Sequence, residues 1–223
     1  MDKKSETAKY AQTAQLDEPS PPPYSARDTQ ESQVPSPYPP QSYHMQAPLR
    51  TLKAEYTKWT LTGLRVYDAT TSENLYEAKI KWMKSSMAFT KPGSTDPFAT
   101  VKFHTFTPRW DIQFDGMASF TVPLKGKLNY KGMHTSLALQ NSRLTWKCKY
   151  HLSTMDLDCR DERSVMIARM QANVWKYKKI CSIEFFDGES SVHGPIMDEL
   201  VVTGLAMLEY VLMVNPGMVS GSC

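Results

Sequence analysis

Hydrophobic and polar residues alternate with a period of two through much of the chain after residue 48. Alternation of this kind predicts β-strands that are buried on one side only. The runs recur about every 8 to 15 residues with turn residues between them, which is typical of an antiparallel sheet. They lie at 64–66, 78–82, 87–90, 98–106, 110–114, 120–122, 144–150, 155–159, 165–170 and 180–186. Pro123 predicts a strand end or an edge strand, and the absence of helical periods among the runs argues against βαβ units.

The last apolar stretch has a different pattern. Residues 196–214 place apolar side chains all around a helical axis, so this helix is expected in a protein core or in a membrane. It is slightly short for a membrane span and contains Glu209, which favours a core helix over an anchor. Asp198 and Glu199 fall in the expected first turn, and Asn215 with Pro216 and Gly217 ends the helix. Glu209 is expected to reach a partner or an opening, because an unpaired buried carboxylate is costly.

One such helix after about ten strands fits inside a closed antiparallel barrel, which also removes the sheet edges. We therefore predict a mainly β protein, with a β-barrel at 49–215 around a core helix at about 197–214. A flexible C-terminus is expected at 216–223. Residues 1–48 hold nine of the 15 prolines and few aliphatic residues. Such a segment buries too little apolar surface to offset chain entropy, so we predict a disordered tail.

The tail carries a short interaction motif. Pro21, Pro22, Pro23 and Tyr24 spell PPxY, and Pro35, Pro37 and Tyr38 belong to a degenerate second copy, PSPY. Prolines favour the polyproline II conformation, so little entropy is lost when such a segment docks in the aromatic groove of a WW domain. We predict WW-domain partners, plausibly ubiquitin ligases of the HECT class. The alternative is a low-complexity spacer in which the motif arose by chance.

Three lysine pairs stand out in the predicted barrel. They are Lys79 and Lys81, Lys147 and Lys149, and Lys176 and Lys178. Residues two apart project from the same side of a strand, so neighbouring strands would combine the pairs into a cationic patch for anionic lipid headgroups. The alternative is the ordinary solvated outside of a barrel. The net charge of +3 is too small to argue for nucleic acid.

No pattern of catalytic or metal-binding residues is present. The five histidines are scattered, and the four cysteines show no CxxC spacing, so we expect no enzyme activity, no cofactor and no metal site. Cys148 and Cys181 lie in strand-like runs and are expected to be buried. Trp59, Trp82, Trp110, Trp146 and Trp175 are expected in the core or the barrel wall. The charged N-terminus lacks a secretory signal, which predicts a cytoplasmic protein, and lipidation of Cys223 is left open.

The sequence resembles the tubby C-terminal-like superfamily, which includes tubby, the phospholipid scramblases and the LURP-one-related proteins of plants. The resemblance is carried by the segments 144–148, 165–169 and 198–205 and is closest to small uncharacterised fungal members. It implies a twelve-stranded barrel threaded by a hydrophobic C-terminal helix. Tubby is a phosphoinositide-binding adaptor, and scramblases join a PPxY-bearing tail to a similar barrel. This chain lacks the cysteine cluster that scramblases use for palmitoylation and any acidic loop resembling a calcium site.

Two functions follow as expectations. The first is a non-enzymatic adaptor that binds WW domains through its tail, with peripheral membrane contact by the barrel. The alternative is a lipid-handling protein that binds or moves phospholipids, in which the tail is a spacer. Fold-level resemblance alone does not decide between them.

Overall fold

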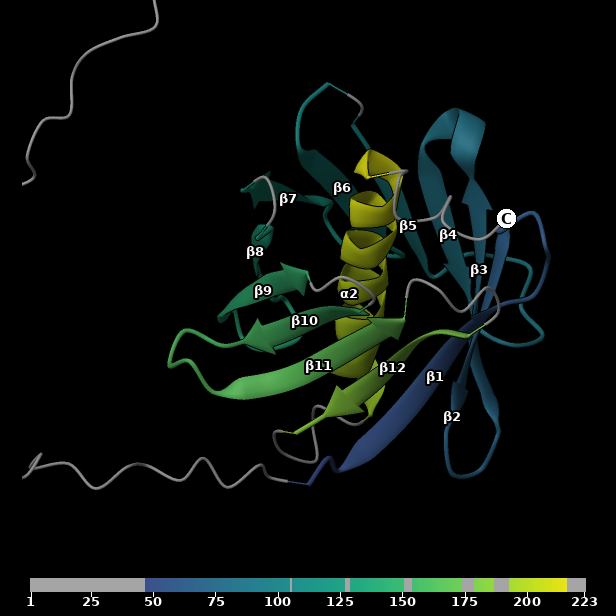
Figure 1. The fold of residues 1–223 in the computed structure, drawn as a ribbon, viewed down its shortest axis with the longest axis horizontal. Coiled ribbons are helices and arrows are strands. Elements are labelled where there is room, and N and C mark those ends of the chain that lie inside the picture. The colour runs from purple at the N-terminus through teal and green to yellow at the C-terminus, as the bar shows by residue number, and fades with distance from the viewer. Residues whose placement is uncertain are drawn as a thin grey trace, which may run out of the picture. The chain divides into compact units, whose positions relative to one another are not determined.

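A computed structural model describes residues 47–104, 106–126, 129–150, 154–173, 179–186 and 193–215. The chain divides into two units, 1–43 and 44–223, and the described residues all belong to the second. Twelve antiparallel strands form a closed barrel around one helix, which confirms the predicted fold class (Figure 1). The elements are β1 Arg50–Tyr56, β2 Gly63–Asp68, β3 Asn74–Lys81, the 3₁₀ turn η1 Trp82–Lys84, β4 Ser86–Thr90, β5 Ala99–Phe103, β6 Arg109–Phe114, β7 Phe120–Lys125, β8 Lys131–Thr135, β9 Arg143–Tyr150, β10 Thr154–Arg160, β11 Met166–Asn173, β12 Lys179–Phe185 and α2 Gly194–Val214.

Each strand pairs with its neighbours in sequence, and the β1–β12 pair closes the ring. The sequence pattern did not single out β1 or β8. The prediction that Pro123 marks a strand end or edge was wrong, because Pro123 lies inside β7 and pairs with Arg109 of β6. Its exposed ring lies on the outer surface, and the next residue supplies the backbone donor, from Leu124 N to Pro108 O at 2.7 Å. The barrel tolerates the missing N–H at this one position.

The helix α2 passes through the barrel interior and confirms the core-helix prediction. It begins at Gly194, with Pro195 in its first turn, and ends at Val214, with the Asn215 side chain bonded to Val211 O at 2.9 Å. Because the helix starts earlier than expected, Asp198 and Glu199 lie beyond its first turn, and the prediction that they offset the helix dipole there was wrong. Both carboxylates instead bond to barrel residues.

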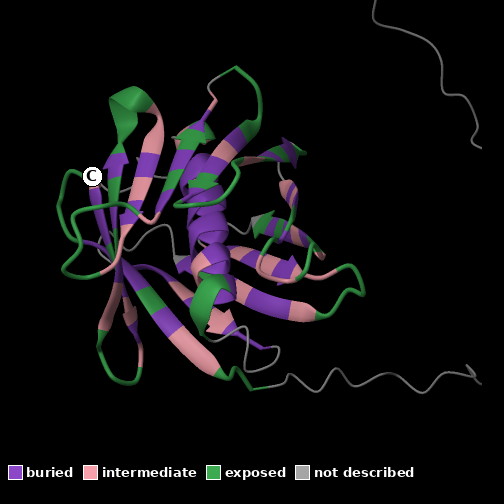
Figure 2. Cartoon of the chain, turned by 180° about the vertical axis from the view of Figure 1, so that it is seen from behind, coloured by how far each residue is buried: buried purple, intermediate pink, exposed green. Residues whose placement is uncertain are grey.

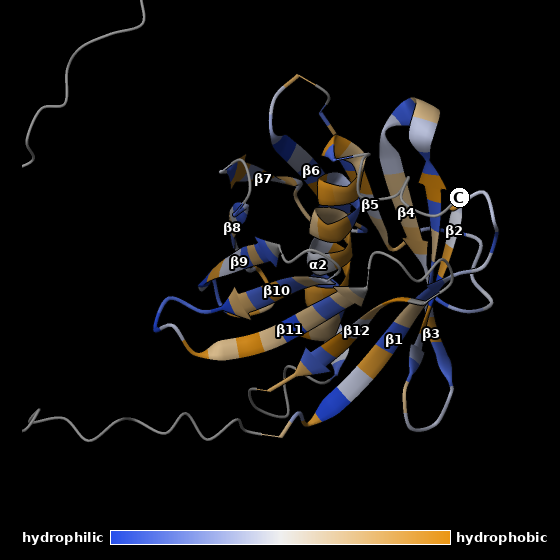
Figure 3. Ribbon diagram, in the orientation of Figure 1, coloured by the Kyte–Doolittle hydropathy of each residue, from blue (hydrophilic) through white to orange (hydrophobic). Residues whose placement is uncertain are grey.

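The core lies between α2 and the inward side chains of the strands. Figure 2 shows α2 buried along almost its whole length, and Figure 3 shows its continuous hydrophobic surface against alternating strands. The helix lies closest to the wall at Gly204, where a Cβ atom would stand 2.8 Å from Trp146 Cη2 and 2.1 Å from Met170 Cε. Any larger residue would push the helix away from β9 and β11, so glycine is required here for close packing.

Polar side chains on α2 fix its position in the barrel. Glu199 is buried and accepts bonds from Ser136 Oγ at 3.1 Å and Ala138 N at 3.3 Å, while its other oxygen lies 2.9 Å from His134 Nε2. Thr203 accepts a bond from Trp146 Nε1 at 3.0 Å. Because hydrogen bonds are directional, these contacts set the rotation and depth of a helix whose apolar surface alone would not select one orientation.

Candidate functional site

Alternating strand directions place the connections of the barrel at two rims. The connections β1–β2, β3–β4, β5–β6 and β7–β8 lie at the rim where α2 ends, and Figure 1 shows the β3–β4 and β5–β6 connections near that end of the helix. We call this end the basic rim and define it by the described residues 57–62, 82–85, 104, 106–108, 126 and 129–130 and the strand ends beside them.

The basic rim contains cations and no carboxylates in its connections. Among the described residues of these connections there is no Asp or Glu, whereas Lys58 and Lys84 both lie there. The five connections described at the opposite rim carry five Asp or Glu residues and two Lys or Arg residues, at positions 69–73, 91–98, 115–119, 136–142 and 161–165. The barrel is therefore electrostatically polar along its axis, and anions are attracted to one end.

The carboxylates nearest to the basic rim are already paired. Asp111 Oδ2 lies 2.7 Å from His104 Nε2, and Asp111 Oδ1 accepts a bond from Thr121 Oγ1 at 2.7 Å. These bonds, led by the one from Thr121, lower the pKa of Asp111. Glu55 is buried in an ion pair with Arg65. Neither of these two carboxylates is left to neutralise the lysines of the rim, whereas Asp156 and Asp158 of β10 lie directly opposite Lys149 and Lys147 in the sheet.

Lysines of three adjacent strands lie in register on the outer wall beside this rim. Lys125 of β7 pairs with Lys131 of β8, which pairs in turn with Lys147 of β9. No ion pair joins any of the three to a described residue. Like charges directly opposite one another destabilise a sheet, so this lysine ladder (Lys125, Lys131 and Lys147) reduces stability at the Lys125–Lys131 pair, while Lys147 also has Asp158 of β10 opposite it.

Large apolar side chains stand exposed among these cations. Trp59 is 80% exposed in the β1–β2 connection, Met83 is 101% exposed in η1, and Phe106 is 99% exposed in the β5–β6 connection. Trp82 is also exposed. Exposed aromatic residues beside lysines are the composition of a surface that meets the headgroup region of a bilayer.

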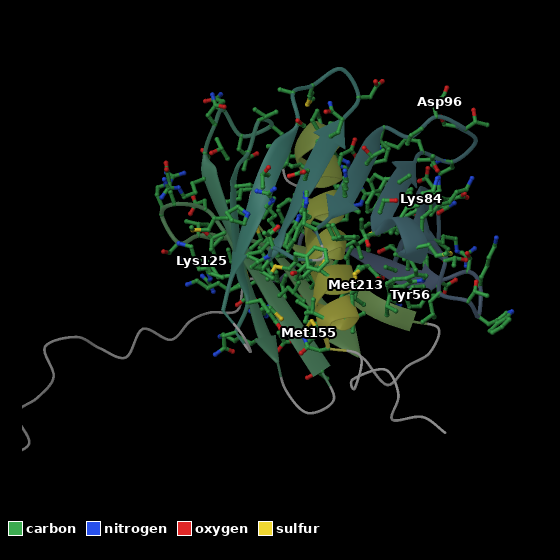
Figure 4. All side chains as sticks on the ribbon, turned by 90° about the horizontal axis from the view of Figure 1, so that it is seen from above. Tyr56, Lys84, Asp96, Lys125, Met155 and Met213 are labelled. Carbon is green, nitrogen blue, oxygen red and sulfur yellow. The ribbon has the colours of Figure 1, made fainter. Side chains whose placement is uncertain are left out.

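The structure places the predicted lysine pairs on different walls. Lys79 and Lys81 lie exposed on β3, and Lys147 and Lys149 lie exposed on β9, six places away in the ring of twelve strands. The sequence hypothesis required neighbouring strands. Because β3 and β9 are not neighbours, these two pairs do not form one patch on the wall. Both pairs lie instead toward the basic rim, and Figure 4 shows Lys84, beside the first pair, and Lys125, beside the second, on opposite sides of α2. Lys176 and Lys178 lie outside the described residues.

Other predicted residues have mixed outcomes. The motif residues Pro21, Pro22, Pro23, Tyr24, Pro35, Pro37 and Tyr38 lie outside the described residues, as do Trp175 and Cys223. Cys148 and Cys181 are buried, as expected, and burial raises the pKa of both thiols. Trp110 and Trp146 are fully buried.

The prediction of a core or wall position was wrong for Trp59 and Trp82. Strand alternation places Trp82 inward, after Ala78 and Ile80, but the chain leaves β3 at Lys81 and turns into η1. Trp59 lies in the connection after β1. A break in alternation next to a turn is the signal that sequence reasoning could have used.

One polar pair lies inside the barrel near the basic rim. Glu209 of α2 is fully buried, and Tyr56, the last residue of β1, donates a hydrogen bond to Glu209 Oε1 at 2.8 Å. Glu209 Oε2 has no hydrogen-bond partner among the described residues. The sequence expectation that Glu209 reaches a partner is thus met for one of its two oxygens.

Within the described ranges, no group of three or more His, Cys, Asp or Glu side chains is placed to hold a metal ion. No helix in the same ranges combines the length and apolar character needed to cross a bilayer.

Comparisons with known proteins are sparse. No family model matches the sequence, and no curated protein matches it. A solved X-ray structure of a protein from Arabidopsis thaliana shares 16% identity, covering 74% of this chain and 93% of that chain with a TM-score of 0.43. That likeness is too low to carry an argument. The twelve-stranded barrel around a C-terminal helix is the architecture that the tubby-like resemblance implies, and membership of that superfamily and the tie to its fungal members stay predictions.

Proposed function

We propose that this protein is a non-enzymatic binding protein that docks peripherally on anionic membranes through its basic rim. The observation that supports this most is the basic rim itself, where exposed apolar side chains accompany Lys58 and Lys84 and no described residue of the connections is a carboxylate. Each lysine near an anionic membrane surface contributes about 1 kcal/mol of binding free energy. Exposed Trp59 and Phe106 add a contribution that does not depend on salt. Several such lysine and aromatic contributions together are enough for reversible membrane binding in the cytoplasm.

Vesicle sedimentation tests this proposal. Wild-type protein is expected to bind vesicles of phosphatidylcholine with phosphatidylserine at low salt, to bind less at high salt, and to ignore pure phosphatidylcholine. Removing two charges of the lysine ladder, with Lys125→Gln and Lys131→Gln, is expected to weaken binding about 30-fold. Relief of like-charge repulsion in this variant would keep the fold intact or strengthen it.

The matched control removes two cations from the opposite rim, with Arg143→Gln and Arg163→Gln. Both residues are exposed, so this variant carries the same net charge and is expected to bind vesicles like the wild type. If both double variants weakened vesicle binding equally, the effect would depend on the net charge of the protein and not on the position of the lysines. Absence of wild-type binding at low salt would contradict the proposal.

We propose as a second function that the PPxY tail recruits WW-domain proteins, plausibly HECT-class ubiquitin ligases. The observation in its favour is the complete motif Pro21-Pro22-Pro23-Tyr24 in a proline-rich segment. The prolines favour the bound conformation before binding, and the tyrosine fills a pocket that generic proline-rich ligands leave empty. Combined with the basic rim, such a tail would make the protein an adaptor at the membrane.

A tail peptide of residues 15–45 tests this function against a panel of WW domains. We expect dissociation constants in the micromolar range, lost with Tyr24→Ala and retained with Tyr38→Ala, because the second copy has Ser36 where the motif requires proline. Fluorescence anisotropy measures all three peptides. Binding that survives Tyr24→Ala and disappears with Tyr38→Ala would assign the site to the second copy, and no binding to any domain would reduce the tail to a spacer.

A further inference from the structure

Glu209 is an unusual component of the core. Its side chain is fully buried and has one partner, the Tyr56 hydroxyl, 2.8 Å from Oε1. Its second oxygen has no hydrogen-bond partner among the described residues. A buried carboxylate in this state loses most of its hydration and recovers only one hydrogen bond. The side chain is therefore far more compatible with the folded core when it carries a proton.

The groups around Glu209 do not compensate a negative charge. The titratable groups that face it are Tyr56 from β1 and Cys181 from β12, and the pKa of both is raised, first by burial and then by the charge of ionised Glu209. At the next helix residue, Tyr210, β5 and β6 present Phe103 and Trp110, which are uncharged. No described Lys, Arg or His forms an ion pair with Glu209. Burial raises the pKa of Glu209 to about 7, although the bond from Tyr56 opposes the shift.

This part of α2 also holds the strands that carry the exposed apolar residues of the rim. Tyr56 ends β1 immediately before the connection that contains Trp59. Tyr210, next to Glu209, packs against Phe103 and Trp110 with ring centroids 6.2 and 5.5 Å apart. Those two rings end β5 and begin β6, on either side of the connection that contains Phe106. A change at Glu209 and Tyr210 therefore reaches both connections through direct contacts.

We infer that the proton on Glu209 acts as a latch. The protonated side chain keeps the end of α2 in place inside the barrel and the β1–β2 and β5–β6 connections ordered. Ionisation of the carboxyl opens the latch. The inference rests on the proposed function in one respect, since it assigns regulation to the basic rim. Protonation then favours the ordered rim, and ionisation favours its loosening. The group that changes its charge, Glu209, is buried inside the barrel, so the latch acts on the order of the surface.

The direction with pH follows from linkage. A carboxyl with a folded-state pKa above its unfolded value binds more protons when folded, so stability is highest at low pH and falls as pH rises from the unfolded to the folded pKa. With the ordinary value of 4.5 and the folded value of about 7, the opening equilibrium increases about 30-fold between pH 5.5 and pH 8. Most of that change lies below pH 7.5.

Hydrogen exchange of the full chain tests the latch. After correction for intrinsic exchange rates, residues 57–62, 104–108 and 205–214 are expected to show the 30-fold pH dependence in the wild type and to lose it in Glu209→Gln. His104 also lies at the rim, so His104→Gln serves as the control and is expected to keep the dependence. Equal pH dependence in wild type and Glu209→Gln would overturn the inference.

A second variant tests the latch even if the barrel core does not accept glutamine at position 209. Tyr56→Phe removes the hydrogen bond that lowers the pKa of Glu209, so the midpoint of the exchange profile should move to higher pH. An unchanged or lower midpoint would also overturn the latch. Vesicle binding measured in parallel separates the two proposals. If hydrogen exchange shows the expected pH dependence but the protein does not bind vesicles, membrane docking is rejected and the latch is kept.

Discussion

Truncation of the chain after His193, which removes α2, is expected to abolish cooperative folding of the barrel. Seven large apolar side chains of the helix are fully buried: Leu200, Val201, Val202, Leu205, Met207, Leu208 and Val211. Each contributes roughly 1.5 to 3 kcal/mol on burial, so their loss costs about 10 to 20 kcal/mol. Whole domains are stable by only about 5 to 15 kcal/mol, and the loss therefore exceeds or matches the total.

The strands would not compensate for this loss. Without the helix, inward side chains such as Trp110, Trp146 and Phe89 would line a cavity that no other described element can fill. Far-UV circular dichroism with a thermal scan measures the outcome, and the truncated chain is expected to lack a cooperative transition. A chain ending after Asn215 is the control, because it keeps every described contact of α2. A soluble truncated chain with a wild-type transition would disprove the role of α2 as the core.

Replacement of Glu199 by alanine is expected to destabilise the protein by about 3 to 5 kcal/mol, because one partner of a buried polar network is removed. The substitution leaves His134 Nε2, Ser136 Oγ and Ala138 N without their acceptor. Each unsatisfied buried donor costs about 1 to 3 kcal/mol. Urea denaturation followed by tryptophan fluorescence reports the change through Trp110 and Trp146, which are both in the core.

The adjacent carboxylate provides the matched control. Asp198 accepts bonds from Tyr76 and Lys91, both at 2.6 Å, but the Lys91 side chain is 43% exposed. Water can therefore replace part of the hydrogen bonding that Asp198→Ala removes. The free energy of unfolding is expected to fall by about 1 kcal/mol. If Glu199→Ala cost no more than Asp198→Ala, the buried network would not contribute to stability as proposed.

The fold was predictable from sequence because its signals are local. Alternation with a period of two survives in β3, β5 and β6, where buried and exposed residues follow one another without interruption. The all-round apolar character of 196–214 left only a core or a membrane as its location. β8 escaped prediction because its two inward residues are Gly132 and His134, so its sequence shows no alternation of apolar and polar side chains. Gly132 faces the core, where a Cβ would lie 3.2 Å from Val122.

The candidate site was only partly predictable. Lysine pairs two apart showed that one side of each strand is cationic, but the position of β3 relative to β9 depends on closure of the ring, which spacing does not encode. The basic rim becomes visible only when connections are sorted by the direction of their strands. The composition of its described residues, without a carboxylate, was present in the sequence all along, distributed over four segments that are far apart in the chain.

The position of α2 after all twelve strands has a consequence for synthesis. Hairpins of neighbouring strands can form as the chain elongates, but the residues that they must enclose are made last. At about 5 to 20 residues per second, roughly 7 to 30 s separate the first strand from the helix. During that interval the inward sides of the strands have no filling and remain exposed to other chains. Holding chaperones at the ribosome are therefore expected to set the yield of folded protein in a cell.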